Sequence, residues 1–356
     1  MNPSEITFAA YMEKALYGPE GYYSSGRART GREGDYFTAP ETGGVFAELL
    51  WEIFVGWQAR LGSDPFHLVE VGAGEGALAS ALVRLPARCR ANWNYTAVER
   101  SPARRTLLEA ASISLPRAFR ILPDLDVFAQ APVSGCFFAN ELIDAFPVHR
   151  VRRRGGKLEE AFVRPGEAAH LTWGPLSTDA LAAYFRRLGI ELPEGYETEV
   201  NLAMAGWIRS VAPALKQGIV LIIDYGRPAR DYYAPERCGG TLRGFRRHRV
   251  ISDILAVSEP VDLTADVDFT SLALDAREAG LAPLAFMEMG SFLMAGARKL
   301  LENGSPHAEF KRTALRYLIH PEGLGSAFHV LILGKGETVL QWRFEANRLS
   351  RLGLPA

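Results

Sequence analysis

The chain has 356 residues, a length that suggests one large domain with insertions or two unequal lobes. Its 48% hydrophobic and 23% charged residues are close to the averages of soluble globular proteins, which excludes the disordered and fibrous classes. Forty basic and 41 acidic residues give a net charge of −1, so no overall attraction to nucleic acid or anionic lipid is expected. No apolar stretch approaches the roughly 20 residues of a membrane-spanning helix, and we expect no membrane insertion.

Cysteine usage and the N-terminal sequence bear on the compartment. Cys89, Cys136 and Cys238 are too few and too scattered for a disulfide framework, and none forms a CxxC pair, so no metal site is expected. The N-terminus lacks the basic start and apolar stretch of a secretory signal, and it is not arginine-rich and acid-poor like a transit peptide. These features predict a cytoplasmic protein.

Residues 1–64 differ in texture from the rest of the chain. Helices are expected there around a loop rich in glycine and tyrosine, over residues 17–23 and 30–41. Such a loop is typical of a shaped binding loop, and equally of a turn that packs its tyrosines on the core. We expect this segment to form a cap.

Four short apolar runs predict buried strands, over residues 67–71, 94–99, 134–139 and 219–223. Helical patterns follow the first two, over 77–85 and 101–111, and Ser101 before Pro102 is typical of a helix start. Apolar strands that alternate with helices indicate a parallel sheet covered on both faces. The predicted fold class is therefore α/β, doubly wound.

Two stretches interrupt this pattern and predict an inserted lobe. Residues 148–163 indicate a β-hairpin that turns at Gly155 and Gly156, and residues 170–215 indicate a helical segment. A closing strand pair is expected over 285–289 and 327–333. The expected division is a cap (1–64), the first half of the core (65–150), the inserted lobe (151–215) and the second half of the core (216–356). The hairpin arginines are interpreted as a solvated face and not as a nucleic-acid patch; they are Arg150, Arg152, Arg153 and Arg154.

A glycine-rich turn follows the first predicted core strand. Gly72, Gly74 and Gly76 would let the backbone pass close to a ligand. A dinucleotide would place its pyrophosphate on the helix that follows, whereas S-adenosylmethionine carries a sulfonium and an ammonium. Glu70 before the turn suits the cationic ligand better, and Glu99, at the end of the second strand, could accept both ribose hydroxyls. The residues therefore favour S-adenosylmethionine; a dinucleotide and a tight turn without a ligand are the alternatives.

Polar side chains follow two further strands, at the edge of the sheet where α/β proteins bind ligands. Asn140, Glu141 and Asp144 come after the strand at 134–139 and could face the methyl donor or grip a cation. The alternative is a helix cap by Asn140 with a solvated Asp144. Asp224 and Tyr225 repeat the pattern after the strand at 219–223.

The ordered set of motifs resembles the MidA-type S-adenosylmethionine-dependent methyltransferases, relatives of the mitochondrial complex I assembly factor that methylates an arginine. The segments that carry the resemblance are 21–23, 34–41 with 46–48, 70–76, 140–148, 223–226, 240–242 with His248, 262–264 and 267–269. The resemblance implies a Rossmann-like class I methyltransferase sheet with an N-terminal cap and an inserted hairpin and helical lobe. It also implies S-adenosylmethionine as donor and a protein arginine as acceptor, with a subunit of respiratory complex I as a candidate partner.

The candidate site residues follow from these motifs. Those expected to bind the cofactor are Glu70, Gly72, Gly74, Gly76, Glu99, Asp124 and Asn140. Those expected to bind the substrate are Asp35, Thr38, Tyr225 and His248. Carboxylates are needed to orient a guanidinium and to accept its proton, because the pKa of arginine lies far above neutral pH. The candidate catalytic residues are Glu41, Glu141, Asp144 and Asp224, with Glu41 and Glu141 preferred.

Three classes of function are weighed at this point. A protein methyltransferase is favoured. An oxidoreductase that uses NAD(P), and a non-catalytic assembly or interaction protein that retains the fold, are the alternatives.

Overall fold

The computed structural model describes residues 5–25, 44–85, 93–112, 119–164, 169–246, 249–251, 253–256, 260–302 and 308–355. Its centre is a sheet in the order β15-β16-β10-β5-β2-β3-β4, and β14 pairs with the end of β10. The bounds are β2 (Phe66–Val71), β3 (Trp93–Val98), β4 (Phe119–Leu122), β5 (Val133–Asn140), β10 (Leu215–Arg227), β14 (Val267–Asp268), β15 (Ala282–Glu288) and β16 (Phe328–Lys335). The pairs from β4 to β10 are parallel, and β16 is antiparallel to β10 and β15.

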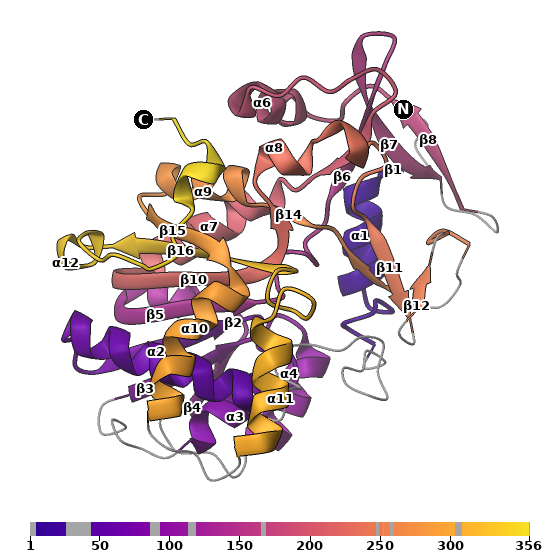
Figure 1. Cartoon of the computed structure of the whole chain (residues 1–356). Helices are drawn as coiled ribbons and strands as arrows, with labels where there is room; N and C mark the ends of the chain where they lie inside the picture. The colour runs from indigo at the N-terminus through magenta and orange to yellow at the C-terminus, as the bar shows by residue number, and fades with distance from the viewer. Residues whose placement is uncertain are drawn as a thin grey trace.

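Helices cover both faces of this sheet, which confirms the predicted doubly wound α/β class (Figure 1). One face is covered by α2 (Val45–Leu61), α3 (Ala77–Arg84), α10 (Met289–Glu302) and α11 (Ala308–Ile319), with Leu108 of α4 (Pro102–Ser112). The other face is covered by α5 (Asp126–Gln130), α7 (Ala203–Ala214) and α9 (Phe269–Glu278).

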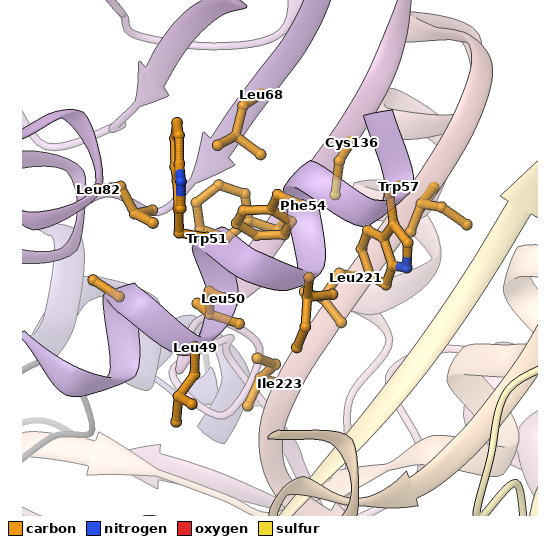
Figure 2. Close-up of a cluster of buried hydrophobic side chains, with 14 of the residues drawn as sticks. Leu49, Leu50, Trp51, Phe54, Trp57, Leu68, Leu82, Cys136, Leu221 and Ile223 are labelled. Carbon is orange, nitrogen blue, oxygen red and sulfur yellow. The ribbon is translucent and has the colours of Figure 1, made fainter. Parts of the chain in front are cut away.

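Helix α2 packs on the central sheet, although it falls within the segment expected to form the cap. Figure 2 shows its side chains directed at the strands. The ring centroids of Phe54 and Phe138 lie 5.3 Å apart, and those of Trp51 and Trp93 lie 4.5 Å apart. Among the described residues, the part of 1–64 that lies away from the sheet's covering layers is residues 5–25.

A second, five-stranded sheet lies beside the first. It has the order β1-β7-β6-β9, with β8 paired to β7. The bounds are β1 (Ile6–Thr7), β6 (His149–Arg154), β7 (Lys157–Arg164), β8 (His170–Gly174) and β9 (Glu197–Val200), and α1 (Phe8–Tyr17) and α6 (Asp179–Leu188) accompany it. The predicted hairpin is confirmed, and Gly155 and Gly156 form its turn at φ 59° and 75°.

The expectation that 170–215 is helical is wrong in part, because β8 and β9 lie within it. Both are short strands that complete their hydrogen bonding against the hairpin, β8 on β7 and β9 on β6. Strands of four or five residues carry too little periodicity to be recognised without that partner. Strand β4 was not predicted for the same reason: it has four residues, none of them fully buried.

The other predicted core strands and helices are confirmed within one to four residues at each boundary. A three-stranded sheet in the order β12-β11-β13 follows β10, with β11 (Arg243–Arg246), β12 (Arg249–Ile251) and β13 (Asp262–Thr264). The remaining short elements are α8 (Ala229–Tyr232), α12 (Glu337–Leu340) and 3-10 turns at Pro235–Arg237 and Leu349–Leu352. In the described part of the chain, no helix is both long and apolar enough to cross a membrane.

Candidate functional site

The glycine turn between β2 and α3 has a backbone that requires glycine. Gly72, Gly74 and Gly76 have φ values of 79°, 56° and 84°, all in the left-handed region. A Cβ on Gly72 would lie 2.6 Å from Cδ1 of Leu142, whereas one on Gly74 would meet nothing closer than 3.5 Å. The middle of the turn is therefore open, and its first glycine allows close packing against the segment after β5.

Glu99, directly after β3, is held by the backbone on both oxygens. Gly74 N–H donates to its Oε2 at 2.9 Å, and Ser101 N–H donates to its Oε1 at 2.8 Å. Two donors use two of the roughly four lone-pair sites of a carboxylate, so Glu99 can accept further hydrogen bonds. Ser101 also caps α4, since its Oγ accepts from Arg104 N–H at 3.3 Å, as its position before Pro102 predicted.

A cavity of about 430 Å³ opens at the carboxyl ends of β2 to β5. The structure brings four of the predicted site residues together in its wall, namely Gly72, Glu99, Asp124 and Glu141. Its further lining comes from Val71, Val98, Arg100, Arg104, Pro123, Leu125, Asp126, Leu142, Ala145, Phe146 and Pro147. A volume of this size is in the range of small-molecule sites.

The N-terminal segment supplies one wall of this cavity. The Arg100 guanidinium lies 3.9 Å from the centroid of the Tyr17 ring, and that of Arg104 lies 4.3 Å from the Tyr23 ring. The Tyr17 hydroxyl donates to the carbonyl of Ala145 at 3.1 Å. Tyr22 and Tyr23 are buried, so the loop both packs its tyrosines and lines a cavity, and its tyrosine content was the signal.

Helix α7 supplies another wall, through Ala203, Trp207 and Ser210. The Trp207 ring meets Phe146 edge-on, with centroids 6.3 Å apart. We had not predicted these residues as part of the site, because α7 comes at the end of the segment expected to form the inserted lobe.

Glu70 lies apart from the cavity. Side chains alternate along β2, so Val71 faces the cavity and Glu70 points to the opposite face, where the Tyr95 hydroxyl donates to it. Burial raises the pKa of Glu70 to about 8, against a smaller lowering by the Tyr95 hydrogen bond. A carboxyl with this pKa is mostly protonated at pH 7, so the negative charge at the cavity comes from other residues.

The turn after β5 carries Glu141 into the cavity wall. Glu141 has φ 52°, a left-handed backbone value that residues other than glycine rarely adopt. Asn140 Nδ2 donates to Glu141 Oε1 at 3.1 Å, so Asn140 supports its neighbour and caps no helix. Asp124, on the other side of the cavity, accepts from Asp126 N–H at 3.0 Å at the start of α5.

Asp144 and Asp224 are buried beside this turn and are absent from the cavity lining. Burial raises the pKa of Asp144 well above its ordinary value, and repulsion from Asp224, Glu141 and Asp262 raises it further. Burial also raises the pKa of Asp224, but backbone N–H groups that it accepts stabilise its anionic form. Asp144 is buried, so the alternative of a solvated Asp144 is wrong.

The remaining predicted residues lie elsewhere or are not described. Tyr225 is part-buried against Phe328, with ring centroids 3.9 Å apart, and does not line the cavity. The four others, Asp35, Thr38, Glu41 and His248, lie outside the described residues. Among the described residues, no group of three His, Cys, Asp or Glu side chains could hold a metal ion.

Comparison with known families decides the class of the protein. Residues 49–287 match the family model described as "Putative S-adenosyl-L-methionine-dependent methyltransferase". The chain belongs to this family. It is an S-adenosylmethionine-dependent methyltransferase, as the motifs had implied, and the oxidoreductase and non-catalytic alternatives are set aside.

Similar proteins agree with this assignment. A candidate methyl transferase from Burkholderia thailandensis, solved with S-adenosyl-homocysteine, is 30% identical with a TM-score of 0.84, over 96% of this chain and 90% of that chain. The mitochondrial protein arginine methyltransferase NDUFAF7 of Rattus norvegicus is 28% identical over 92% of this chain and 80% of the relative. Its homologue from Drosophila melanogaster is 27% identical over 94% and 83%.

These relatives correct the expected location. The curated relatives are named as mitochondrial proteins, so the prediction of a cytoplasmic protein is contradicted. Cysteine usage excludes a disulfide framework, but it does not distinguish one compartment without disulfides from another.

The residues of the cavity fit S-adenosylmethionine. Gly74 leaves its backbone open to a ligand, and Glu99 retains acceptor sites for hydroxyl groups. The lining holds five carboxyl side chains against two guanidinium groups, which suits a ligand with a sulfonium and an ammonium. The acids are Glu13, Glu99, Asp124, Asp126 and Glu141, and the bases are Arg100 and Arg104.

Proposed function

We propose that this methyltransferase modifies an arginine side chain of a protein partner. The observation that supports the proposal most directly is the gathering of Glu141 and Asp144, which follow β5, with Asp224 of β10 and Asp262 of β13. Repulsion from the three other acids raises the pKa of Asp144, and a guanidinium bound beside Glu141 would offset this negative charge. The curated relatives over most of the chain are named protein arginine methyltransferases, which points to the same acceptor.

In this proposal the cofactor residues are Gly72, Gly74, Gly76 and Glu99, with Asp124 at the far side of the cavity. Glu70 and Asn140 do not contact the cofactor in this proposal. Glu70 supports β2, and Asn140 supports Glu141. S-adenosylmethionine supplies a methyl group that is already activated on its sulfonium, so the protein chiefly has to align the acceptor and exclude water. Tyr17, Tyr23 and Trp207 provide aromatic walls to the cavity.

We assign the acid–base role to Glu141, which among the described predicted catalytic residues is the one that lines the cavity. Its carboxylate orients the guanidinium and accepts the proton that the nitrogen loses when the methyl carbon is bonded to it. Glu41, Asp35, Thr38 and His248 complete the proposed acceptor site from residues outside the described ranges. A subunit of respiratory complex I is the protein partner that we propose for this site.

The Glu141→Gln variant tests the acid–base role. A positioned acid–base group typically contributes 10²–10⁴-fold, so we expect turnover to fall by about that factor. Affinity for S-adenosylhomocysteine, measured by calorimetry, should stay within about twofold of the wild type. Turnover equal to that of the wild type would refute the role.

The acceptor is identified by labelling. The wild type is incubated with radiolabelled S-adenosylmethionine and a cell extract, with and without purified complex I, and labelled proteins are hydrolysed and sequenced by mass spectrometry. Methylarginine in a protein supports the proposal, and its presence in a complex I subunit supports the partner. Label on another residue type or on a small molecule contradicts the arginine assignment.

A further inference from the structure

Asp224 of β10 holds the turn that follows β5. The N–H groups of Leu142, Ile143 and Asp144 converge on its Oδ2 at 3.2, 2.8 and 3.4 Å. Its Oδ1 accepts from Tyr225 N–H at 2.9 Å, and the residue is 1% exposed. Successive backbone N–H groups that converge in this way form an anion-binding concavity. Here the group that the three amides hold is a side-chain carboxyl of the same protein.

The residue before these three amides is the one whose backbone needs support. Glu141 has φ 52°, and its own N–H donates to the carbonyl of Ile223 at 2.9 Å. A left-handed non-glycine residue persists only where the surrounding contacts determine its conformation. Bonds from β10 on both sides of this position, to Ile223 and Asp224, meet that requirement.

The same turn contacts the cofactor turn. Leu142 packs against Gly72 so closely that a Cβ on that glycine would lie 2.6 Å from Leu142 Cδ1. Glu141, Leu142 and Gly72 all line the cavity, whereas Asp224 does not. The carboxylate of Asp224 therefore acts on the cavity through the turn and without facing a ligand.

We propose that Asp224 is a positioning residue of the methyltransferase, which holds Glu141 in its left-handed conformation by binding the three amides that follow it. This inference rests on the proposed role of Glu141 for its effect on turnover, but not for its effect on the backbone. It differs from the sequence-based expectation that Asp224 is itself catalytic. With its oxygens bonded to four backbone amides, the side chain is committed to the protein.

The Asp224→Asn variant tests the proposal against a matched control, Asp268→Asn. Asp268 is 3% exposed and also accepts backbone N–H groups, from Thr270 at 3.0 Å and Ser271 at 3.2 Å. It caps α9 and lies outside the cavity lining. Both variants lose a buried, amide-bound carboxylate, and only one of them loosens the turn of Glu141.

Backbone amide exchange, followed by mass spectrometry, gives a readout that needs no acceptor. We expect slow exchange of residues 142–144 in the wild type and exchange faster by at least about tenfold in Asp224→Asn, with no change there in Asp268→Asn. Fast exchange of these amides in the wild type, or no change in Asp224→Asn, would overturn the proposal. The wild-type measurement decides the matter even if the variant does not fold.

Turnover and its pH profile separate positioning from proton transfer. Displacing a reacting group by about 1 Å can cost about 10²-fold, so turnover of Asp224→Asn at saturating cofactor should fall by roughly that factor. The decrease of turnover at low pH should remain in Asp224→Asn, whereas it should be absent in Glu141→Gln. If turnover of Asp224→Asn no longer decreases at low pH and its amide exchange is unchanged, Asp224 is the proton acceptor. That result would overturn the proposal. If no methylarginine is formed at all, the proposed function is wrong. The amide-exchange result still tests whether Asp224 holds the turn of residues 141–144.

Discussion

At the scale of single residues, Glu70 shows how burial changes what a carboxyl group contributes. The sequence places an acid two residues before Gly72, which suggested a negative charge near the cofactor. In the fold the side chain is 4% exposed and hydrogen-bonded by Tyr95 on the face of β2 away from the cavity. Its pKa is raised to about 8, chiefly by desolvation. The negative charge at the cavity therefore comes from the carboxyl side chains that line it, among them Glu99 and Glu141.

This raised pKa predicts a pH dependence of stability. Glu70 loses its proton near pH 4.5 in the unfolded chain and near pH 8 in the folded protein. Its contribution to the stability of the fold is therefore fully present below pH 4.5 and is lost as the pH rises to 8. Glu70→Gln keeps the hydrogen-bonding shape without this loss. The free energy of unfolding of the variant relative to the wild type should increase between pH 5 and 8, by up to about 1.4 kcal/mol per pH unit.

Urea denaturation across this pH range measures the effect, with Glu109→Gln as an exposed control on α4. A difference between Glu70→Gln and the wild type that stays constant with pH would contradict the buried, protonated carboxyl.

At the scale of elements, the contact between α2 and α10 depends on one glycine. A Cβ on Gly296 of α10 would lie 2.3 Å from the carbonyl oxygen of Leu49 in α2. Backbone cannot move aside as a flexible side chain can, so the two helices pack closely only without that Cβ. Helix α2 packs directly on the sheet (Figure 2). The close contact with α2 at Gly296 therefore helps to fix where α10 lies.

Two helical glycines therefore respond in opposite ways to alanine. Gly206 of α7 has no atom within 4 Å of its Cβ position, so Gly206→Ala should raise stability by about 0.5–1 kcal/mol through helix propensity. Gly296→Ala should lower it by about 1–3 kcal/mol, because the helices must separate. Chemical denaturation of both variants tests this, and equal effects on stability would show that the close approach is unimportant.

At the scale of the whole molecule, segments far apart in the sequence enclose one cavity. The core turns come from residues 71–147, the aromatic walls from α1 and its loop and from α7 (Figure 1). Helix α1 also packs on the second sheet beside β6 and β7, and the Tyr17 hydroxyl bonds Ala145 at the cavity. The N-terminal segment thus joins the second sheet to the cavity.

This arrangement predicts that Tyr17→Phe weakens cofactor binding. The lost hydrogen bond is worth about 0.5–1.5 kcal/mol, so the Kd for S-adenosylhomocysteine should rise roughly 2- to 10-fold. Tyr11→Phe is the matched control, since the Tyr11 hydroxyl donates at 3.4 Å to Ile254 and does not line the cavity. Calorimetry should show its Kd unchanged within about twofold; an equal rise in both variants would assign the effect to stability of α1 alone.

The sequence by itself determined the elements with strong local signals and the class of the cofactor. Continuous apolar runs, the cap at Ser101 and the three glycines depend on short-range periodicity and backbone sterics, which neighbouring residues carry. The motif order was sufficient to identify the family. The sequence also placed Gly72 and Glu99 at one edge of the sheet, where both line the cavity, because a glycine turn and the acid after the next strand have fixed places in a parallel sheet.

Only the tertiary structure decided which acids face the cavity. Glu70, Asp144 and Asp224, like Glu141, are acids within or shortly after a buried strand, yet they are enclosed by protein and Glu141 lines the cavity. Desolvation and the amides that converge on Asp224 arise from segments about 80 residues apart, so no local window contains them. Packing also decided that Tyr17 and Trp207 line the cavity. The chemistry of a side chain shows what it can bind, but the tertiary structure determines which groups it contacts.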